Sequence, residues 1–185
     1  MRRIIYQNIF VFVVFILFFW IQKLTFFQIQ SNFQNSTAVM GAASLVFLPH
    51  GVRVLSYIFF GPKIFYGLFL AHIISGLSLS LNYFDVFFLA LFSTLSALVA
   101  IKIYTGSFHL KNIKIFNFKF IINVAFIAAI LNSLSCNTYK LFHGSNFNEL
   151  YTSQLIQFIF GDVVGTIVLF YLLLLFKKVI QISFN

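Results

Sequence analysis

Several long apolar stretches constrain the fold of this chain more than any other feature. Residues 5–27, 86–103 and 154–176 consist mostly of Phe, Leu, Ile, Val and Ala. Each is close to the length of about 20 residues that a helix needs to cross the hydrocarbon core of a bilayer. The links between the apolar stretches are too short to fold independently. We therefore predict one domain of the all-α class, a polytopic transmembrane helix bundle.

The composition favours the same class. Hydrophobic residues make up 61% of the chain and charged residues 8%, whereas about 25% of the residues in soluble domains are charged. A net charge of +9 would indicate a nucleic-acid partner in a soluble protein. Here the basic residues stand mostly at the ends of apolar stretches, as topology signals do under the positive-inside rule. We expect the lipid bilayer as a partner and no nucleic acid.

The start of the chain resembles a signal peptide, because Arg2 and Arg3 precede an apolar core. No cleavage site of small residues follows promptly. Trp20, Gln22 and Lys23 are instead typical of a helix end at the membrane interface. We therefore expect a first helix that is retained.

Six spans account for the apolar stretches, and we predict them at 5–27, 38–60, 64–81, 86–103, 120–136 and 154–176. The basic residues then divide unequally between the two sides of the membrane. Lys140 falls on the external side, whereas the cytoplasmic side receives Arg2, Arg3, Lys63, Lys102, Lys111, Lys114, Lys119, Lys177 and Lys178. The positive-inside rule then predicts a multi-pass protein of the inner (plasma) membrane with both termini in the cytoplasm.

The segment 47–63, FLPHGVRVLSYIFFGPK, contains both prolines of the chain, Pro49 and Pro62. Proline removes a backbone hydrogen bond and clashes with the preceding helical turn. We therefore predict that the second span is broken or kinked near Pro49 and ends at Gly61 and Pro62. Two interpretations of this segment stay open. Either the helix is broken there for function, or the segment is a loop between two short spans.

Two charged residues are expected inside the apolar layer, Arg53 in the second span and Asp162 in the sixth. Ionisable groups in a bilayer cost several kcal/mol, so their presence indicates a function or a specific pairing. His50 and His72 fall near the same depth. We predict that these four residues form a ligand or signal pocket. The alternative is a buried ion pair that only fixes helix packing.

The sequence offers little for catalysis or metal binding. It has three acidic residues and one cysteine, Cys136. His50 and His72 lack a third ligand at metal-binding spacing, so we expect no metal and no cofactor. The sequence contains no nucleophile elbow, phosphate loop or zinc-protease motif, so we expect no enzymatic activity.

Small residues recur at four-residue spacing in two neighbouring spans, which lets helix backbones approach closely. We predict that the third and fourth spans pack through these residues. The predicted interface joins Gly67, Ala71 and Ser75 to Ala90, Ser93 and Ala97.

The motifs taken in order resemble the first type of the MASE family, membrane-associated sensor domains at the N-terminus of bacterial histidine kinases and diguanylate cyclases. The similar positions are Pro49, His50 and Gly51, then Phe60, Gly61 and Pro62, then Gly67, and last Gly161, Asp162 and Gly165. This chain has Leu48 and Phe160 where the family often has Trp. The family also usually has more spans and a fused output domain. The resemblance covers about residues 38–176 and implies a sensor of the signal-transduction kind.

We therefore expect a sensor-like membrane domain that binds a small ligand or a partner within the bilayer and passes a signal to a separate protein. A kinase or a cyclase is the expected partner, with a homo-oligomer as an alternative. Two other functions stay open. One is the substrate-binding subunit of a small-solute transporter of the vitamin type, and the other is a structural subunit of a membrane complex.

Overall fold

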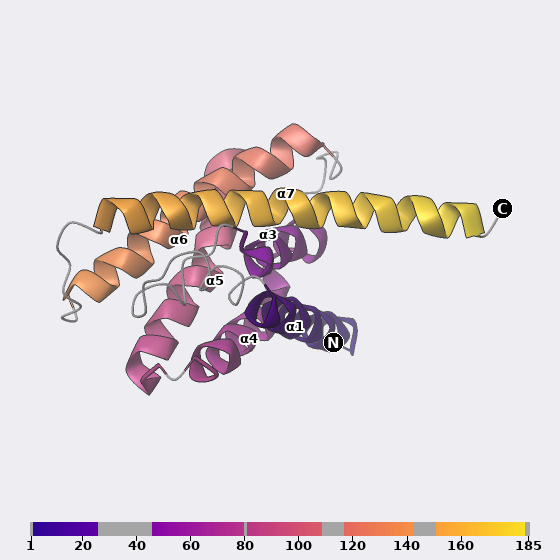
Figure 1. Cartoon of the computed structure of the whole chain (residues 1–185). Coiled ribbons are helices and arrows are strands. Elements are labelled where there is room, and N and C mark those ends of the chain that lie inside the picture. Colours follow the sequence, from indigo (N-terminus) through magenta and orange to yellow (C-terminus); the bar gives the residue numbers. More distant parts are fainter. Residues whose placement is uncertain (1, 26–45, 80, 109–116, 143–150, 184–185) are drawn as a thin grey trace.

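The computed structural model describes residues 2–25, 46–79, 81–108, 117–142 and 151–183. Within them the chain is helical and contains no strand, which confirms the all-α class. In chain order (Figure 1) the elements are α1 (Arg2–Leu24), α3 (Leu48–Phe60), the 3₁₀ helix η1 (Pro62–Ile64), α4 (Phe65–Leu77), α5 (Tyr83–Thr105), α6 (Phe118–Phe142) and α7 (Tyr151–Ser183).

Four of these helices are long and apolar enough to cross a membrane, namely α1, α5, α6 and the part of α7 from Leu155 to Phe176. They coincide with four of the six predicted spans. α3 and α4 have 13 residues each. At about 1.5 Å per residue each is about 20 Å long, shorter than a hydrocarbon core of about 30 Å. The structure thus confirms membrane-capable helices, and the number of six spans stays a prediction.

Pro49 lies in the first turn of α3, which begins at Leu48. At this position proline costs no intrahelical hydrogen bond, because the first N–H groups of a helix have no intrahelical acceptor. Pro49 therefore starts α3 and does not kink it. The earlier part of the predicted second span, residues 38–45, lies outside the described residues.

α3 ends at Phe60, as the sequence predicted for this segment. Gly61 follows with a φ of 74°, in the left-handed region that favours glycine, and its N–H donates to the carbonyl of Tyr57 at 2.9 Å. Pro62 then opens η1, which leads directly into α4. The Gly61 and Pro62 motif therefore forms the turn between α3 and α4.

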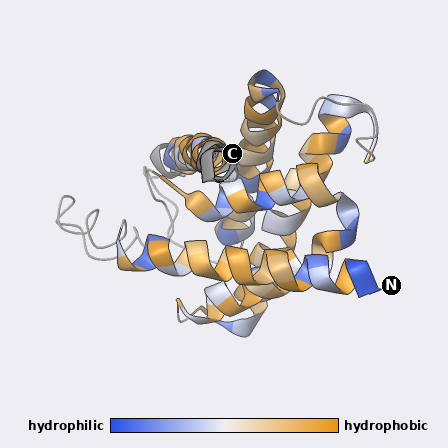
Figure 2. Cartoon of the chain, turned by 90° about the vertical axis from the view of Figure 1, so that its right-hand side faces the viewer, coloured by the Kyte–Doolittle hydropathy of each residue, from blue (hydrophilic) through white to orange (hydrophobic). Residues whose placement is uncertain are grey.

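α3 lies at the centre of the fold, and every residue from Leu48 to Ile58 is buried. It contacts α1, α5, α6 and α7. The helices do not share one axis. Figure 1 views α7 from the side and α1 nearly end-on, and Figure 2 views them the other way round. The C-terminal part of α7 extends beyond the other described helices (Figure 1).

The outer faces of the helices carry many large apolar side chains. Figure 2 shows this apolar surface along α1. Exposed examples on several helices are Ile5, Tyr6, Phe10, Leu70, Phe84, Phe126, Phe160, Leu175 and Phe176. A soluble monomer rarely exposes so large an apolar surface. This surface is compatible with contact to the lipid bilayer.

The predicted packing of small residues between the third and fourth spans is wrong in its main contacts. A Cβ atom on Gly67 would lie 2.4 Å from the backbone oxygen of Asn8, so Gly67 packs against α1 and not against α5. Ser93 of α5 donates to Asn132 of α6. α4 does contact α5, and the pairs that join them include Gly76 with Val86 and Phe69 with Phe87. Asn8 explains the difference, because its side chain accepts from the Gly67 N–H at 2.7 Å.

Candidate functional site

The site begins with a close contact between the backbones of α3 and α7. A Cβ atom on Gly165 would lie 2.1 Å from the backbone oxygen of Phe47. A Cβ atom on Gly51 would lie 2.9 Å from Cα of Thr166. The Phe47 N–H donates to the carbonyl of Gly161 at 2.9 Å. Because glycine has no side chain, the motif glycines allow this approach where any other residue would separate the helices.

Gln22 of α1 holds the start of α3 in place. Its Nε2 donates to the carbonyl of Val46 at 2.5 Å, and the N–H of Leu48 donates to its Oε1 at 3.1 Å. The first N–H groups of a helix need such external acceptors. Gln22 is fully buried. Gln22 therefore faces the protein interior, and its position at an interfacial helix end stays a prediction.

Asp162 of α7 is the centre of a buried polar network (the Asp162 network, made of Asp162, His50, Arg53, His72 and Asn132). Its Oδ2 accepts from Asn132 Nδ2 at 2.9 Å and lies 2.8 Å from His50 Nδ1. The same oxygen lies 3.7 Å from Arg53 Nη2. The side chains of His50, Arg53 and Asp162 are at most 1% exposed. The structure thus brings the two predicted charges together.

His50 and His72 join the network on either side of Arg53. His50 is three residues before Arg53 on α3, so the two side chains share one face of the helix, and His50 Nδ1 contacts Arg53 Nη2. His72 comes from α4, and its Nε2 lies 3.5 Å from Arg53 Nη1. The ring of Phe15 packs on the His72 ring with centroids 4.4 Å apart. All four predicted pocket residues therefore meet.

The network continues to α5 and α6 through residues that sequence reasoning missed. Asn132 Oδ1 accepts from Ser93 Oγ at 2.8 Å, and Cys136 Sγ lies 3.6 Å from the same oxygen. From the sequence, Asn132 counted only as a polar residue in a short span and Ser93 only as a small one. An amide in the middle of an apolar helix was the available signal, because a buried amide needs a partner.

Four polar atoms of the site have no hydrogen-bond partner among the described residues. They are His50 Nε2, Arg53 Nε, Asp162 Oδ1 and the hydroxyl of Tyr57. The cost of burying an ion pair is offset only where hydrogen bonds satisfy the remaining donors and acceptors. The Asp162 network is therefore incompletely satisfied, an arrangement that often marks a functional site.

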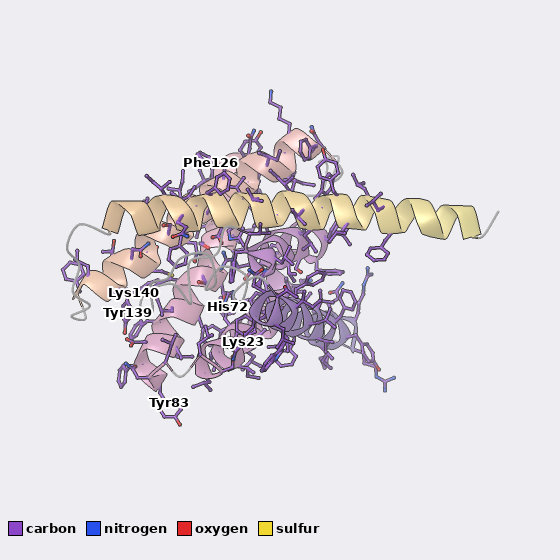
Figure 3. All side chains as sticks on the ribbon, in the orientation of Figure 1. Lys23, His72, Tyr83, Phe126, Tyr139 and Lys140 are labelled. Atoms are coloured by element: carbon purple, nitrogen blue, oxygen red, sulfur yellow. The ribbon has the colours of Figure 1, made fainter. Side chains whose placement is uncertain are left out.

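A cavity of about 420 Å³ adjoins the network. This volume is within the range of ligand-binding pockets. Its described lining is formed by Phe15, Phe19, Phe47, His72, Ser75, Gly76, Leu79, Leu81, Val86, Leu89, Ala90, Ser93, Asn132, Cys136, Lys140 and Phe158. His72, Ser93 and Asn132 thus belong to both the network and the cavity wall. Figure 3 shows His72 in the interior, and Lys140 toward the far end of α6.

The described residues hold no group of three His, Cys, Asp or Glu side chains that a metal ion would need. Of the predicted motif residues, Gly51, Gly161 and Gly165 lie at the contact of α3 and α7, and Pro49 lies in the first turn of α3. Gly61 and Pro62 lie at the other end of α3 and do not line the cavity.

Comparisons of the chain with protein-family models, with curated proteins and with solved structures find no match. The resemblance to the MASE family therefore stays a prediction that rests on the ordered motifs. The geometry of the Asp162 network and its cavity is the ground for a functional proposal.

Proposed function

We propose that this chain is a sensor-like integral membrane domain that binds a small ligand in the cavity and passes a signal to a separate protein. The observation that carries the proposal is the position of His72. Its side chain lines the cavity and also lies 3.5 Å from Arg53, which in turn faces Asp162. A ligand that contacts His72 would therefore act directly on the charged pair between α3 and α7.

α7 supports the second half of the proposal. It carries Asp162 and continues as one helix to Ser183, beyond the other described helices (Figure 1). Its 33 residues correspond to a length of about 50 Å. A continuous helix moves as a rigid element, so a displacement at Asp162 would also move its projecting end. Coupling between the cavity and a partner would then require two positions of α7.

The topology of the proposal follows from the basic residues. We propose a multi-pass protein of the inner (plasma) membrane with both termini in the cytoplasm, in which α3 and α4 contribute the two short spans. The cavity then opens toward the external side, because its described lining lies near the end of α4 and the start of α5. Reporter fusions after Asn185 and between residues 143 and 150 test this. An active periplasmic reporter after Asn185 would contradict it.

We propose no catalytic role. Cys136 and Ser93 line the cavity, but their hydrogen-bond partner is the amide of Asn132, which is not a base. The reaction of a nucleophile would need a histidine or a carboxylate in that place.

One observation favours a second function, the substrate-binding subunit of a small-solute transporter. The cavity is of ligand size and lies on the side that the proposed topology makes external. A carrier would use the same opening to capture its solute. A structural subunit of a membrane complex is the third possibility, for which the exposed apolar faces would serve as contacts.

Purification of the tagged chain from native membranes in mild detergent distinguishes these functions. Stoichiometric recovery of a histidine kinase or a diguanylate cyclase would support the sensor. Recovery of an ATPase pair would support the transporter, and a fixed multi-subunit assembly would support the structural role. The variant Asp162→Asn should weaken the response of the recovered kinase or cyclase, while Leu70→Phe on the exposed face of α4 serves as the control. Recovery of the chain alone or only as a homo-oligomer would contradict the sensor.

A further inference from the structure

We propose that the ligand of this cavity is a small apolar molecule with a hydrogen-bond-acceptor oxygen, a carboxylate or a carbonyl, which His72 Nδ1–H binds. This inference rests on the proposed function, because it names the chemistry of a ligand for the same cavity. It follows from the hydrogen-bonding state of His72 and from the side chains around it.

The tautomer of His72 is set by Arg53. A guanidinium group has only N–H donors, so the His72 Nε2 atom, 3.5 Å from Arg53 Nη1, must act as the acceptor. A neutral imidazole with an acceptor at Nε2 carries its proton on Nδ1. His72 Nδ1–H is thus a donor whose direction is fixed by Arg53 on one edge of the ring and by Phe15 on its face.

This donor has no hydrogen-bond partner among the described residues, although the side chain is half-buried and lines the cavity. The neighbouring hydroxyl groups use their hydrogens internally. Ser75 Oγ donates to the carbonyl of Ala71 at 2.8 Å, and Ser93 Oγ donates to Asn132 Oδ1 at 2.8 Å. His72 therefore offers a ligand a donor that these hydroxyl groups do not.

The charges around the cavity favour an acceptor over a donor. Lys140 lines the cavity, and no Asp or Glu is among its described lining residues. The carboxylate of Asp162 already accepts from Asn132 and lies close to His50. A ligand with an ammonium group would meet the N–H of His72 and would gain no counter-charge from the described lining residues.

The rest of the lining is apolar and rich in aromatic rings. Phe15, Phe19, Phe47 and Phe158 surround the space together with leucine, valine and alanine side chains. Pockets of this kind bind the body of a ligand by apolar contact, and a few polar groups fix its orientation. The Nδ1–H of His72 in this aromatic wall therefore favours a ligand with an apolar body and one acceptor oxygen at its inner end.

Four probes with one shared body test the inference on the full chain in lipid nanodiscs. They are 3-phenylpropionate, 4-phenyl-2-butanone, 3-phenylpropylamine and propylbenzene, which carry a carboxylate, a carbonyl, an amine and no polar group. Ligand-observed NMR, with empty nanodiscs subtracted, gives each Kd. We expect the two acceptor probes to bind at least about tenfold more tightly than the amine and propylbenzene, a difference of about 1.4 kcal/mol, because a ligand without an acceptor leaves the buried donor unpaired.

Variants of His72 identify the donor. His72→Gln keeps an acceptor for Arg53 and a donor for the cavity, so it should retain the preference for acceptor probes. His72→Leu should lose it, and Tyr83→Phe on the exposed start of α5 should not change it. If His72→Leu does not fold, the imidazole ¹⁵N–¹H signal of His72 in the wild type supplies the test, because an acceptor probe should shift it and propylbenzene should not.

Three results would overturn the inference. They are equal binding of all four probes, tighter binding of the amine, and no binding of either acceptor probe to the wild type. None of them decides the proposed function, because recovery of a kinase or cyclase with the purified chain does not depend on these probes. Conversely, a chain purified without such a partner would refute the sensor and leave the ligand chemistry of the cavity standing.

Discussion

Replacing Gly165 with alanine tests the contact on which the site depends. The new Cβ atom would lie 2.1 Å from the oxygen and 2.4 Å from the carbonyl carbon of Phe47. Both are backbone atoms, so no side-chain rotation can relieve the clash. α7 and the start of α3 must therefore separate by about 1.3 Å, from 2.1 to 3.4 Å, before the contact becomes an ordinary van der Waals distance. The separation also pulls Asp162 away from His50 and Arg53.

The magnitude follows from three contributions. Overpacking of a tight contact costs about 1 to 3 kcal/mol, and a rigid backbone partner places this change near the upper value. The hydrogen bond from the Phe47 N–H to Gly161, 2.9 Å long in the wild type, contributes about 1 kcal/mol that is lost. Alanine regains about 1 kcal/mol over glycine in a helix. We expect Gly165→Ala to lower the free energy of unfolding by about 3 kcal/mol.

Gly76→Ala is the matched control within α4. Its Cβ atom would meet only the methyl groups of Val86 at 3.1 Å, and a side chain can move by a few tenths of an ångström. The gain in helix propensity offsets this contact, so we expect a change of less than about 1 kcal/mol. Unfolding in mixed micelles of increasing SDS fraction, followed by far-UV circular dichroism, measures both variants. Equal losses of stability for Gly165→Ala and Gly76→Ala would refute the close contact.

Two further substitutions probe the network and the start of α3. Asp162→Asn leaves the Arg53 charge buried without its partner and should cost about 3 to 5 kcal/mol in the same SDS unfolding experiment. The charge swap of Arg53→Asp with Asp162→Arg should restore little, since Asn132 also donates to Asp162 and His50 lies 2.8 Å from it; full restoration would contradict the network. Gln22→Leu should cost about 1 to 3 kcal/mol through the unpaired Leu48 N–H, and wild-type stability would show that water replaces Gln22.

The sequence was sufficient to predict the polar residues of the site but not its connections. Charged side chains in an apolar layer require partners, so Arg53 and Asp162 were predicted to meet, and the structure has them 3.7 Å apart. Asn132 was missed as a third partner of the carboxylate. A polar residue in an apolar segment indicates that it needs a hydrogen-bond partner. The identity of that partner depends on the rotation and crossing angle of the helices, which no local sequence pattern encodes.

Helix packing was less predictable than helix existence. The four membrane-capable helices were predicted because length and hydropathy are properties of each segment alone. The small residues around Gly67 were assigned to the wrong neighbour, since a small-residue stripe indicates a close approach without naming the partner. The polar side chain of Asn8 determines the contact with α1. Asn8 and Gly67 are 59 positions apart in the sequence, so their contact follows from the folded structure and not from a local pattern.

The glycines and the aspartate of residues 161–165 act together at the contact of α3 and α7. An aspartate side chain is short, so its carboxylate reaches α3 only if the backbones of α3 and α7 are almost in contact. Apolar side chains give little drive to associate helices in lipid, where the surroundings are equally apolar. Gly51 and Gly165 permit the approach, Gly161 accepts from the Phe47 N–H, and the contacts of Asp162 with Asn132 and His50 stabilise it. A ligand that binds His72 would act on this contact through Arg53, which lies within reach of both His72 and Asp162.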